Sequence, residues 1–390
     1  MNRSHALGRT ILKKLIESGY EAYFVGGFVR DYLLNKESDD IDITTNALPD
    51  EVERLFENTK ATGKKYGTIT VFLEEHAFEV TTYRIDKEYE DHRKPESVVY
   101  TNKLIDDLKR RDFTINALAM DIDGDIVDLF NGKDDLKKGI IKAIGNPDER
   151  FNEDALRILR ALRFVSKFNF LIEETTLKSM ENNVEKLNLL PSERVIPELE
   201  YIFKETYQKQ AIKYMVEIDF KRAFPIFTQS IALYSNSEIN LDFTEFFAFS
   251  LCLENKEIPE YWRFSNKEKM LIYHMVHILK TIKNSRFNPS LVYKLGKNAC
   301  LRANKIQLIR FPNNDQEMLI EEIEEHLPIK RRDQMQINGS DLLQIKKVYN
   351  EEIIGEVLEE LEFQVVNRHL QNDFEKLKEY AKILMERLDG

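Results

Sequence analysis

The hydrophobic and polar positions divide the chain into a first third that mixes strand and helix patterns and a longer remainder with helical spacing. Apolar runs at 21–27 (EAYFVGG) and around 41–45 (IDITT) predict strands, with a helix from about Phe28 to Asn35 between them. GTITVFL and AFEVTTYR alternate and are rich in β-branched residues, so they predict a hairpin. LAMDIDGDIVDLF predicts another, with Asp123-Gly124 at its turn. The pattern predicts an α+β unit of about 140 residues.

From Asn152 onward the alternation fades, and Leu, Glu, Lys and Ile recur at helical spacing almost to the end of the chain. This remainder is predicted to be all-α. Turn and capping residues interrupt it at Leu190-Pro191-Ser192, near Pro225, at Asn288-Pro289-Ser290, at Phe311-Pro312 and at Asn338-Gly339-Ser340.

Composition places the chain among globular proteins of several units. At 390 residues it is too long for one core, so about two to four units are expected. No apolar run approaches the roughly 18 to 20 residues of a membrane span, and the N-terminus lacks the apolar core of a signal peptide. We therefore expect a cytoplasmic protein without a membrane partner. Cys252 and Cys300 lack the neighbours of a CxxC or zinc arrangement, so buried reduced thiols are expected.

The net charge of −11 argues against a protein that coats nucleic acid indiscriminately, because such proteins need an excess of Lys and Arg. It leaves room for a local basic cleft. If RNA is the substrate, we expect its path to be a narrow basic strip, with the acidic excess displaced to the other side.

The segment SDDIDITT carries a candidate metal site. Asp40 and Asp42 are separated by one residue in a stretch of strand character, and residues two apart on a strand project to the same side. Two carboxylates held together repel unless a cation lies between them, and hard oxygen ligands suit Mg²⁺. The alternative is an exposed acidic turn, which produces the same DxD pattern.

A glycine turn just upstream strengthens the metal and phosphate interpretation. Gly26-Gly27 follows a predicted strand and precedes a helix, where backbone N–H groups can approach an anion without a side chain in the way. Arg30, on the first turn of that helix, can reach the same phosphate. A plain strand-to-helix turn with a surface Arg–Asp pair remains the alternative.

Two further polar segments fit either a site or an ordinary surface. Glu79 begins the second strand of the predicted hairpin and either stands beside the aspartates or caps the strand. Arg110, Arg111 and Asp112 precede a short helical pattern that carries Asn116, and could hold phosphates and sugar hydroxyls or form a surface charge cluster.

The stretch EDALRILRALRF at 153–164 places an acid and a row of arginines on an otherwise apolar helix. Asp154 and Arg157 are one turn apart, and Arg160 and Arg163 continue the row. Taken alone, this stretch is an amphipathic helix whose Asp154 and Arg157 pair with each other.

Taken in order, these motifs resemble those of class II tRNA nucleotidyltransferases, the CCA-adding enzymes, which are a branch of the polymerase-β-like nucleotidyltransferases. The resemblance covers the first 165 residues, and WRFSNKEK and INGSDLL further along are similar to bacterial members. Its motifs are GGFVRD (26–31), DDID (39–42), EVTT (79–82), RRDFTINALAM (110–120) and EDALRILRALRF (153–164).

The resemblance implies an α+β catalytic head followed by an all-α neck, body and tail. The implied parts are a nucleotidyltransferase head at 1–140, a neck with the base-recognition helix at 141–205, a body at 206–312 and a tRNA-binding tail at 313–390. The implied reaction is ordered, template-independent addition of C, C and A to the tRNA 3′ end from CTP and ATP, with Mg²⁺ and release of pyrophosphate. A homodimer is left open.

Residue by residue, Asp40 and Asp42 match the family's catalytic metal ligands. The nucleotide contacts fall on Gly27, Arg30, Arg111, Asp154, Arg157, Arg160 and Arg163, and supporting or ribose contacts on Gly26, Glu79, Asp112 and Asn116.

Asp154 and Arg157 match the pair that reads the incoming base. Cytosine and adenine both present an amine beside an unprotonated ring nitrogen, so one acceptor next to one donor suits both. Uracil and guanine present a carbonyl beside a ring N–H, which leaves buried polar groups unpaired at a cost of several kcal/mol.

Several alternatives remain. Bacterial poly(A) polymerases share the head motifs but tend to have basic extensions and a basic, phenylalanine-containing strand ahead of the position of EVTT; here that stretch is TGKKYGTITVFL, with Tyr66-Gly67-Thr68 at the family's HGT-like element. Enzymes that add only CC have a shortened loop after EVTT, whereas RIDKEYEDHRKPESVVY (84–100) is full length; an A-adding specialist stays open.

The intact acidic and basic motifs argue against a non-catalytic RNA-binding protein. None of the seven histidines precedes an aspartate, which argues against an HD phosphohydrolase.

Overall fold

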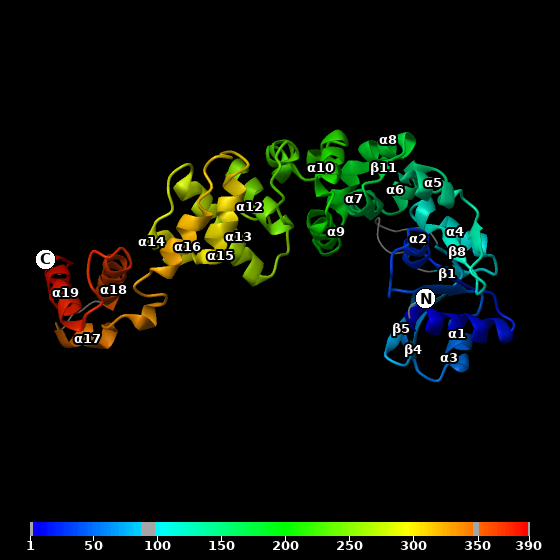
Figure 1. Ribbon diagram of the computed structural model, residues 1–390, viewed down its shortest axis with the longest axis horizontal. Helices are drawn as coiled ribbons and strands as arrows, with labels where there is room; N and C mark the ends of the chain where they lie inside the picture. Colours follow the sequence, from blue (N-terminus) through cyan, green and yellow to red (C-terminus); the bar gives the residue numbers. More distant parts are fainter. Residues whose placement is uncertain (1–2, 87–97, 346–350, 389–390) are drawn as a thin grey trace. The chain divides into compact units, whose positions relative to one another are not determined.

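A computed structural model of the protein describes residues 3–86, 98–345 and 351–388, and its fold is drawn in Figure 1. The chain forms two units. The first comprises Met1–Ser235 with Tyr261–Arg263, and the second comprises Asn236–Glu260 with Phe264–Gly390.

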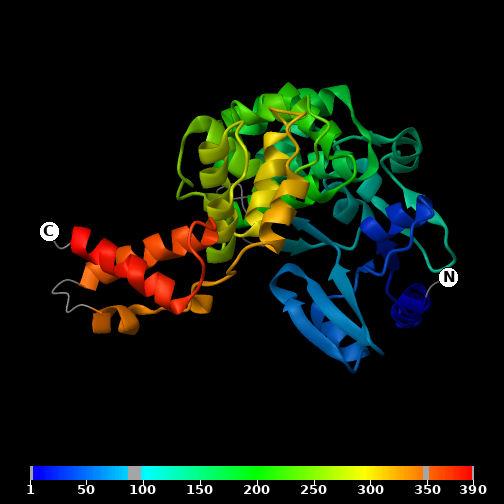
Figure 2. The same cartoon turned by 60° about the vertical axis from the view of Figure 1, so that its left-hand side comes forward.

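A mixed sheet of seven strands, in the order β3-β4-β5-β2-β1-β8-β9, is the centre of the N-terminal part of the first unit (Figure 2). All neighbours in it are antiparallel except β2 and β5, which run parallel. Its strands are β1 (Ala22–Val25), β2 (Asp42–Thr45), β3 (Thr59–Gly63), β4 (Thr68–Leu73), β5 (His76–Thr82), β8 (Leu118–Met120) and β9 (Ile126–Asp128). Two short pairs lie outside it: β6 (Arg84–Asp86) with β7 (Val98–Tyr100), and β10 (Ile140–Ile141) with β11 (Leu171–Ile172).

Helices cover this sheet because its central strands are apolar. Phe24, Ile43 and Val80, on three adjacent strands, have almost no exposed surface. Helix α1 contacts β1 and β2, α2 contacts β1 and β8, and α3 contacts β4 and β5. The helical segments of this part are α1 (Arg3–Glu17), α2 (Gly27–Leu33), α3 (Pro49–Leu55), η1 (Lys64–Tyr66), α4 (Leu104–Lys109), η3 (Thr114–Asn116) and α5 (Gly132–Lys138).

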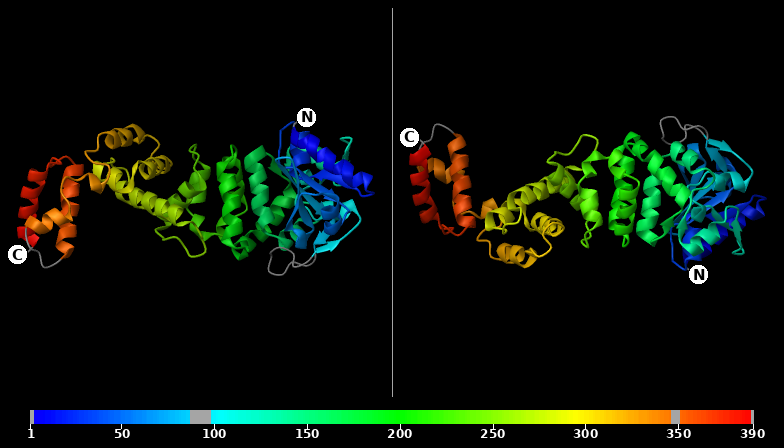
Figure 3. Two further views of the ribbon diagram at one scale, coloured as in Figure 1. Left: turned by 90° about the horizontal axis from the view of Figure 1, so that it is seen from below. Right: turned by 90° about the horizontal axis from the view of Figure 1, so that it is seen from above.

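The rest of the first unit is helical, and helix α7 is at its centre. Helix α7 packs against α9 and α10, and Figure 3 shows these helices lying side by side. Ile158, Leu162 and Val165 are fully buried and form the core face of α7. The segments are α6 (Pro147–Glu153), α7 (Leu156–Phe168), α8 (Glu174–Asn183), η4 (Val184–Leu189), α9 (Ser192–Lys204), α10 (Gln208–Glu217), η5 (Phe220–Arg222), η6 (Pro225–Phe227) and α11 (Ser230–Ser235).

The second unit is all-α in the residues that the structure describes. Two apolar clusters stabilise it, one spanning residues 278–320 and one spanning 329–385. The predicted break at Asn288-Pro289 is confirmed, since the Asn288 side chain accepts the Leu291 N–H and caps α14. Its segments are α12 (Phe243–Glu254), α13 (Asn266–Ile282), α14 (Pro289–Leu295), α15 (Lys297–Gln307), α16 (Glu317–Glu325), η7 (Arg332–Gln334), α17 (Gly339–Ile345), α18 (Glu351–Val366) and α19 (Phe374–Leu388).

The predicted fold class, an α+β head followed by helices, is confirmed. One predicted helix is wrong: residues 153–164 are not continuous, because α6 ends before Asp154 and α7 begins after it. Asp154 has an extended backbone (φ −148°, ψ 102°), and its Oδ1 accepts the Leu156 N–H. A side chain that satisfies a nearby backbone donor in this way competes with the helix and breaks it.

Two smaller expectations were incomplete. Strand β11 lies within the region predicted to be helical throughout. Cys300 is buried as expected, but Cys252 is only partly buried; both thiols are free.

Most of the predicted loop at 84–100 lies outside the described residues. Within the described residues, no helix combines the length and the apolarity needed to cross a bilayer.

Gly132 allows α5 to lie directly on η3, the short turn that carries Asn116. A Cβ at this position would overlap the Thr114 carbonyl and touch Leu118. We expect Gly132→Ala to destabilise the first unit by about 2 kcal/mol or more, because backbone atoms cannot yield as a side chain can. Urea unfolding followed by the fluorescence of Trp262, the single tryptophan, which belongs to the first unit, measures this.

The matched control is Lys133→Ala on the same helix, whose exposed side chain should change the unfolding free energy by less than about 0.5 kcal/mol. Equal effects of the two substitutions would contradict the close-approach argument.

Candidate active site

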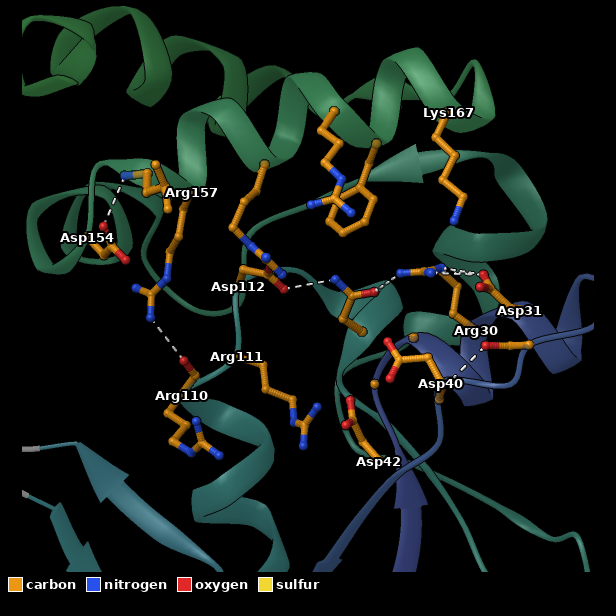
Figure 4. Close-up of a pocket in the computed structure, with 18 of the residues that line it drawn as sticks. Arg30, Asp31, Asp40, Asp42, Arg110, Arg111, Asp112, Asp154, Arg157 and Lys167 are labelled. Atoms are coloured by element: carbon orange, nitrogen blue, oxygen red, sulfur yellow. Dashed lines mark hydrogen bonds and ion pairs between the residues drawn. The ribbon is translucent and has the colours of Figure 1, made fainter. Parts of the chain in front are cut away.

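A pocket of about 640 Å³ lies in the first unit, beside the sheet and under helix α7 (Figure 4). Eight cationic and five acidic side chains line it, so the pocket is cationic although the chain carries a net charge of −11. Its lining residues are Gly26, Gly27, Arg30, Asp31, Ser38, Asp40, Asp42, Arg110, Arg111, Asp112, Asn116, Asp154, Leu156, Arg157, Arg160, Arg163, Phe164, Lys167 and Arg194.

The glycine turn lies at the edge of this pocket. Gly26 precedes α2 with φ 68° and ψ −133°, a conformation that L side chains rarely adopt. A Cβ here would be 3.1 Å from Arg111 Nη1 and 3.4 Å from Asp42 Oδ2. The missing side chain therefore lets the backbone approach the cationic and acidic groups of the pocket together.

The paired aspartates both line the pocket. Asp42 is the first residue of β2, and Asp40 lies in the loop just before that strand. Burial, together with repulsion by Asp40 and Glu79, raises the pKa of Asp42 to about 6, although Arg111 opposes the shift. Negative charge is thus concentrated here beyond what the neighbouring protein groups neutralise.

Glu79 stands beside Asp42 and outside the pocket lining. It pairs in register with Asp42 across β5 and β2, and its side chain is exposed. The expectation that Glu79 begins its strand is wrong, because β5 begins at His76. Of the two alternatives, proximity to the aspartates is the one that the register supports.

Arg110 and Arg111 are oriented by one buried acid. Asp107 Oδ1 accepts from Arg110 at 2.8 and 3.0 Å, and Asp107 Oδ2 accepts from Arg111 Nη2 at 3.3 Å. Burial alone would raise the pKa of Asp107, but the two guanidinium groups lower it. Arg111 Nε is buried and, among the described residues, has no hydrogen-bond partner, so a donor remains for an anion.

A chain of hydrogen bonds crosses the floor of the pocket from α7 to α2 (Figure 4). Arg160 Nε donates to Asp112 Oδ2 at 2.7 Å, Asn116 Nδ2 donates to Asp112 Oδ1 at 2.9 Å, and Arg30 Nη1 donates to Asn116 Oδ1 at 2.7 Å. Arg30 Nε continues the chain to Asp31 at 2.9 Å. Burial opposes ionisation of Asp112, but Arg160 and the hydrogen bonds lower its pKa to about 2.

Asp154 and Arg157 do not pair with each other, contrary to the sequence-based expectation. Arg194 Nη2 from α9 donates to Asp154 Oδ2 at 2.7 Å. Arg157 donates to Glu153 at 2.6 Å and to the Arg150 and Arg110 carbonyls at 2.8 and 3.0 Å. The break at Asp154 turns its carboxylate towards α9. Each group is therefore held in place by partners of its own.

The remaining arginine of the row, Arg163, packs its guanidinium 3.9 Å from the centre of the Tyr201 ring and contacts Glu198 at 3.4 Å. Overall, the pocket brings together every predicted site residue except Glu79.

Sequence reasoning missed Lys167 and Arg194, both of which line the pocket. Lys167 continues the helical spacing of the arginine row and could have been found by extending it. Arg194 lies on another helix, and its Nη1 is buried without a hydrogen-bond partner in the described part of the chain. No local signal marks Arg194, because its position beside Asp154 results from the packing of α9 on α7.

A glycine turn, adjacent carboxylates and a cationic pocket at the end of one mixed sheet define this protein as a nucleotidyltransferase. Three family models match the chain: the poly A polymerase head domain at 22–142, the probable RNA and SrmB-binding site of polymerase A at 169–230, and tRNA nucleotidyltransferase domain 2 (putative) at 244–381. The CCA-adding enzyme of Ligilactobacillus salivarius is 38% identical, and that of Staphylococcus saprophyticus 36% identical, each over 96% of this chain and 96–97% of the relative. The chain belongs to the family of CCA-adding enzymes, which confirms the resemblance found in its motifs.

Solved structures agree. The Bacillus stearothermophilus CCA-adding enzyme in complex with CTP matches with a TM-score of 0.84 and 28% identity, over 100% of this chain and 98% of that one. A CCA-adding enzyme complexed with ATP matches with a TM-score of 0.70 and 27% identity, covering 97% and 95%. The Thermotoga maritima enzyme complexed with tRNA matches with a TM-score of 0.65 and 25% identity, covering 98% and 95%.

The raised pKa of Asp42 predicts a stabilising substitution. An acid with a folded-state pKa of about 6 and an ordinary value of 3.8 when unfolded loses stability as pH rises through this window. In metal-free protein above pH 7, we expect Asp42→Asn to raise the free energy of unfolding by roughly 1–3 kcal/mol, and to have little effect near pH 4. Urea unfolding at the two pH values measures this.

The exposed Asp123, at the turn between β8 and β9, provides the control, and Asp123→Asn should leave the pH dependence unchanged. A lower free energy of unfolding for Asp42→Asn than for the unsubstituted protein at pH 8 would show that ionised Asp42 does not destabilise the metal-free fold.

Proposed function

We propose that this protein adds C, C and A in order to the 3′ end of tRNA from CTP and ATP, without a nucleic-acid template, releasing pyrophosphate. The observation that carries the proposal is the separate fixation of Asp154 and Arg157 at the wall of the pocket that also holds Asp40 and Asp42. Solved relatives of the same fold are complexes with CTP, ATP and tRNA, and these ligands are carried over to this chain as part of the proposal.

Asp40 and Asp42 are proposed to hold Mg²⁺. Within the described residues no group of three metal-binding side chains occurs, but Mg²⁺ is often held by one or two carboxylates and substrate phosphates. The raised pKa of Asp42 fits this, because a cation would relieve the repulsion from Asp40 and Glu79. Two ions held there would lower the pKa of the primer 3′-hydroxyl and would stabilise the leaving pyrophosphate.

Around the aspartates, arginines are proposed to hold the triphosphate. Gly27 presents backbone next to the pocket without a side chain, and Arg30, Arg111, Arg160 and Arg163 line it. The unpartnered Nε of Arg111 supports this role. In the transfer, the primer 3′-oxygen forms a bond to the α-phosphorus, and the bond from that phosphorus to pyrophosphate breaks. Asp112 and Asn116 are proposed to contact the ribose while they orient Arg160 and Arg30.

The base is proposed to be read by Asp154 as acceptor and Arg157 as donor. The Leu156 N–H and Arg194 orient Asp154, and Glu153 with two carbonyls orients Arg157. Groups fixed before the nucleotide arrives lose little entropy on binding and cannot rotate to suit U or G. A pre-formed edge of this kind replaces a template base.

The four-part division remains part of this proposal: head 1–140, base-reading neck 141–205, body 206–312 and tRNA-binding tail 313–390. Two apolar clusters in the second unit support two parts there, although the first cluster includes Ile320 of the proposed tail. A narrow basic tRNA path over the helical parts also remains a prediction, which a measured or calculated surface potential without such a strip would contradict.

The decisive assay offers labelled CTP and ATP to tRNA that ends at the discriminator base or carries one or two further residues of the CCA end. The complete enzyme should extend each substrate to CCA and stop. Long A tails would favour the poly(A) alternative. Incorporation on the longest substrate alone would identify an A-adding enzyme, and addition that stops after CC would identify a CC-adding one.

Asp42→Ala should reduce transfer by at least about a thousandfold and leave tRNA affinity within a factor of a few, because the substitution removes a metal ligand. Asp123→Ala, at an exposed turn of the same sheet, should retain wild-type rates. Gel-shift binding and single-turnover transfer measure the two quantities. Normal transfer by Asp42→Ala would refute the metal assignment.

Replacing Asp154 and Arg157 together by alanine should lower discrimination against UTP and GTP more than it lowers tRNA affinity. Arg194→Met should produce a partial version of the same defect, about tenfold, since a charge-assisted hydrogen bond to Asp154 is lost. Ratios of kcat/KM for CTP over UTP and for ATP over GTP measure the effect.

Arg263→Met is the control for Arg194→Met. Arg263 forms an exposed ion pair with Glu193, which lies next to Arg194 on α9, so the loss of this pair should leave the kcat/KM ratios unchanged. Selectivity that survives the double alanine substitution would show that the base is read elsewhere.

A further inference from the structure

A second pocket, of about 470 Å³, lies in the second unit between α12, α13 and α15 and has no role in the proposed reaction. A volume of this size falls in the ordinary range of small-molecule sites. Its lining residues are Phe249, Cys252, Leu253, Asn255, Leu279, Lys280, Lys283, Ile306, Gln307, Arg310 and Phe311.

The charges of this pocket are all of one sign. Lys280, Lys283 and Arg310 line it, and no lining residue is acidic, in a chain with eleven more acidic than basic side chains. The hydrogen-bond partner of Lys280 is the neutral side chain of Asn255, at 2.7 Å. A concentration of positive charge that lining carboxylates do not neutralise favours an anion.

One of the lining residues, Gln307, has a buried acceptor without a partner. Gln307 is 3% exposed, and its Nε2 donates to Asn304 Oδ1 at 3.0 Å and to the Asn314 carbonyl at 3.3 Å. These two acceptors set the orientation of the amide, since the opposite orientation would place Oε1 against them. Gln307 Oε1 then has no partner among the described residues, although buried acceptors are normally satisfied.

The remaining lining is apolar and partly aromatic. Phe249, Leu253, Leu279, Ile306 and Phe311 supply it, and the Arg310 guanidinium lies 5.5 Å from the centre of the Phe311 ring. Such surfaces accept flat rings, which gain stacking and cation–π contacts.

We propose that this pocket binds one nucleotide, with its base against the apolar lining, a base N–H donating to Gln307 Oε1, and its phosphate on Lys280, Lys283 and Arg310. A fatty acid or other hydrocarbon anion would contact the apolar and cationic groups but would leave Gln307 Oε1 without a hydrogen bond. A buried acceptor without a hydrogen bond costs free energy. Inorganic phosphate leaves the apolar surface uncovered. The nucleotide is either free or an unpaired residue of the tRNA, in which case the inference rests on the proposed function.

Cys252 provides a direct readout, because it lines this pocket and is half-buried, while Cys300 is fully buried. The full-length protein is treated with N-ethylmaleimide, and modification of Cys252 is followed by peptide mass spectrometry. Ligand at about ten times its Kd should slow the reaction about tenfold. The ligands are AMP, CMP, octanoate, inorganic phosphate and tRNA that lacks its CCA end.

Protection by AMP or CMP without tRNA assigns a free-nucleotide site, and protection by tRNA alone assigns an RNA nucleotide; both support the inference. Protection by neither overturns it, as does protection by octanoate or phosphate as strong as that by AMP. Transfer to tRNA is measured on the same preparation. Active enzyme with unprotected Cys252 would refute the pocket alone, whereas inactive enzyme would refute the proposed function.

Lys283→Ala with Arg310→Ala should reduce the protection ratio at least fivefold, whatever the basal reactivity of Cys252, since the ratio compares each variant with and without ligand. Both side chains are exposed at the rim, so the fold should be kept. The control is Lys267→Ala with Lys382→Ala, which removes the same charge from exposed positions elsewhere in the unit. Equal loss in both double variants would assign the protection to non-specific attraction and overturn the site.

Discussion

The buried chain of hydrogen bonds from Arg160 through Asp112 and Asn116 to Arg30 is the constraint on which the rest of the site depends. It joins the helix α7 to the glycine turn and α2 of the sheet-bearing part. Asp112 is almost fully buried and remains ionised because Arg160 and two hydrogen-bond donors compensate for its loss of water. Breaking one link would leave a buried charge unpaired, which costs more than the link itself contributes.

Further contacts hold the side chains at both ends of the pocket. Asp40 and Asp42 lie at the sheet end and the proposed base-reading pair, Asp154 and Arg157, at the helix end. Arg111 is held by Asp107, Asp154 by Arg194, and Arg157 by Glu153 and two backbone carbonyls. Because groups of the protein itself hold these side chains, binding costs little reorganisation. The exception is Asp42, whose pKa is raised by burial and by repulsion from Asp40 and Glu79, which fits the proposed cation.

Both pockets follow one electrostatic rule in an acidic chain. Cationic side chains outnumber acidic ones in both, eight to five in the first pocket and three to none in the second, although the whole chain has eleven more acidic than basic side chains. In a concave site, where water is displaced, this excess attracts an anion most strongly. The first pocket also contains five acidic side chains, among them Asp40 and Asp42, which suits the proposed binding of a cation together with phosphates. The second adds an unsatisfied amide oxygen and aromatic rings, which suit recognition without chemistry.

The sequence by itself determined the fold class, most strands, the breaks between helices and nearly all of the candidate site. It could do so because alternation, caps and short charged motifs are local, and because Gly26, Asp42 and Arg111 each lie in a recognisable local pattern. The tertiary structure decided which side chains of the site contact one another. The sequence pattern favoured an Asp154–Arg157 pair, but the helix break turns Asp154 towards Arg194 on α9, and parallel pairing of β2 with β5 brings Glu79 beside Asp42. Those contacts join residues 40 and 37 positions apart, and packing of whole elements, which no local pattern encodes, determines them.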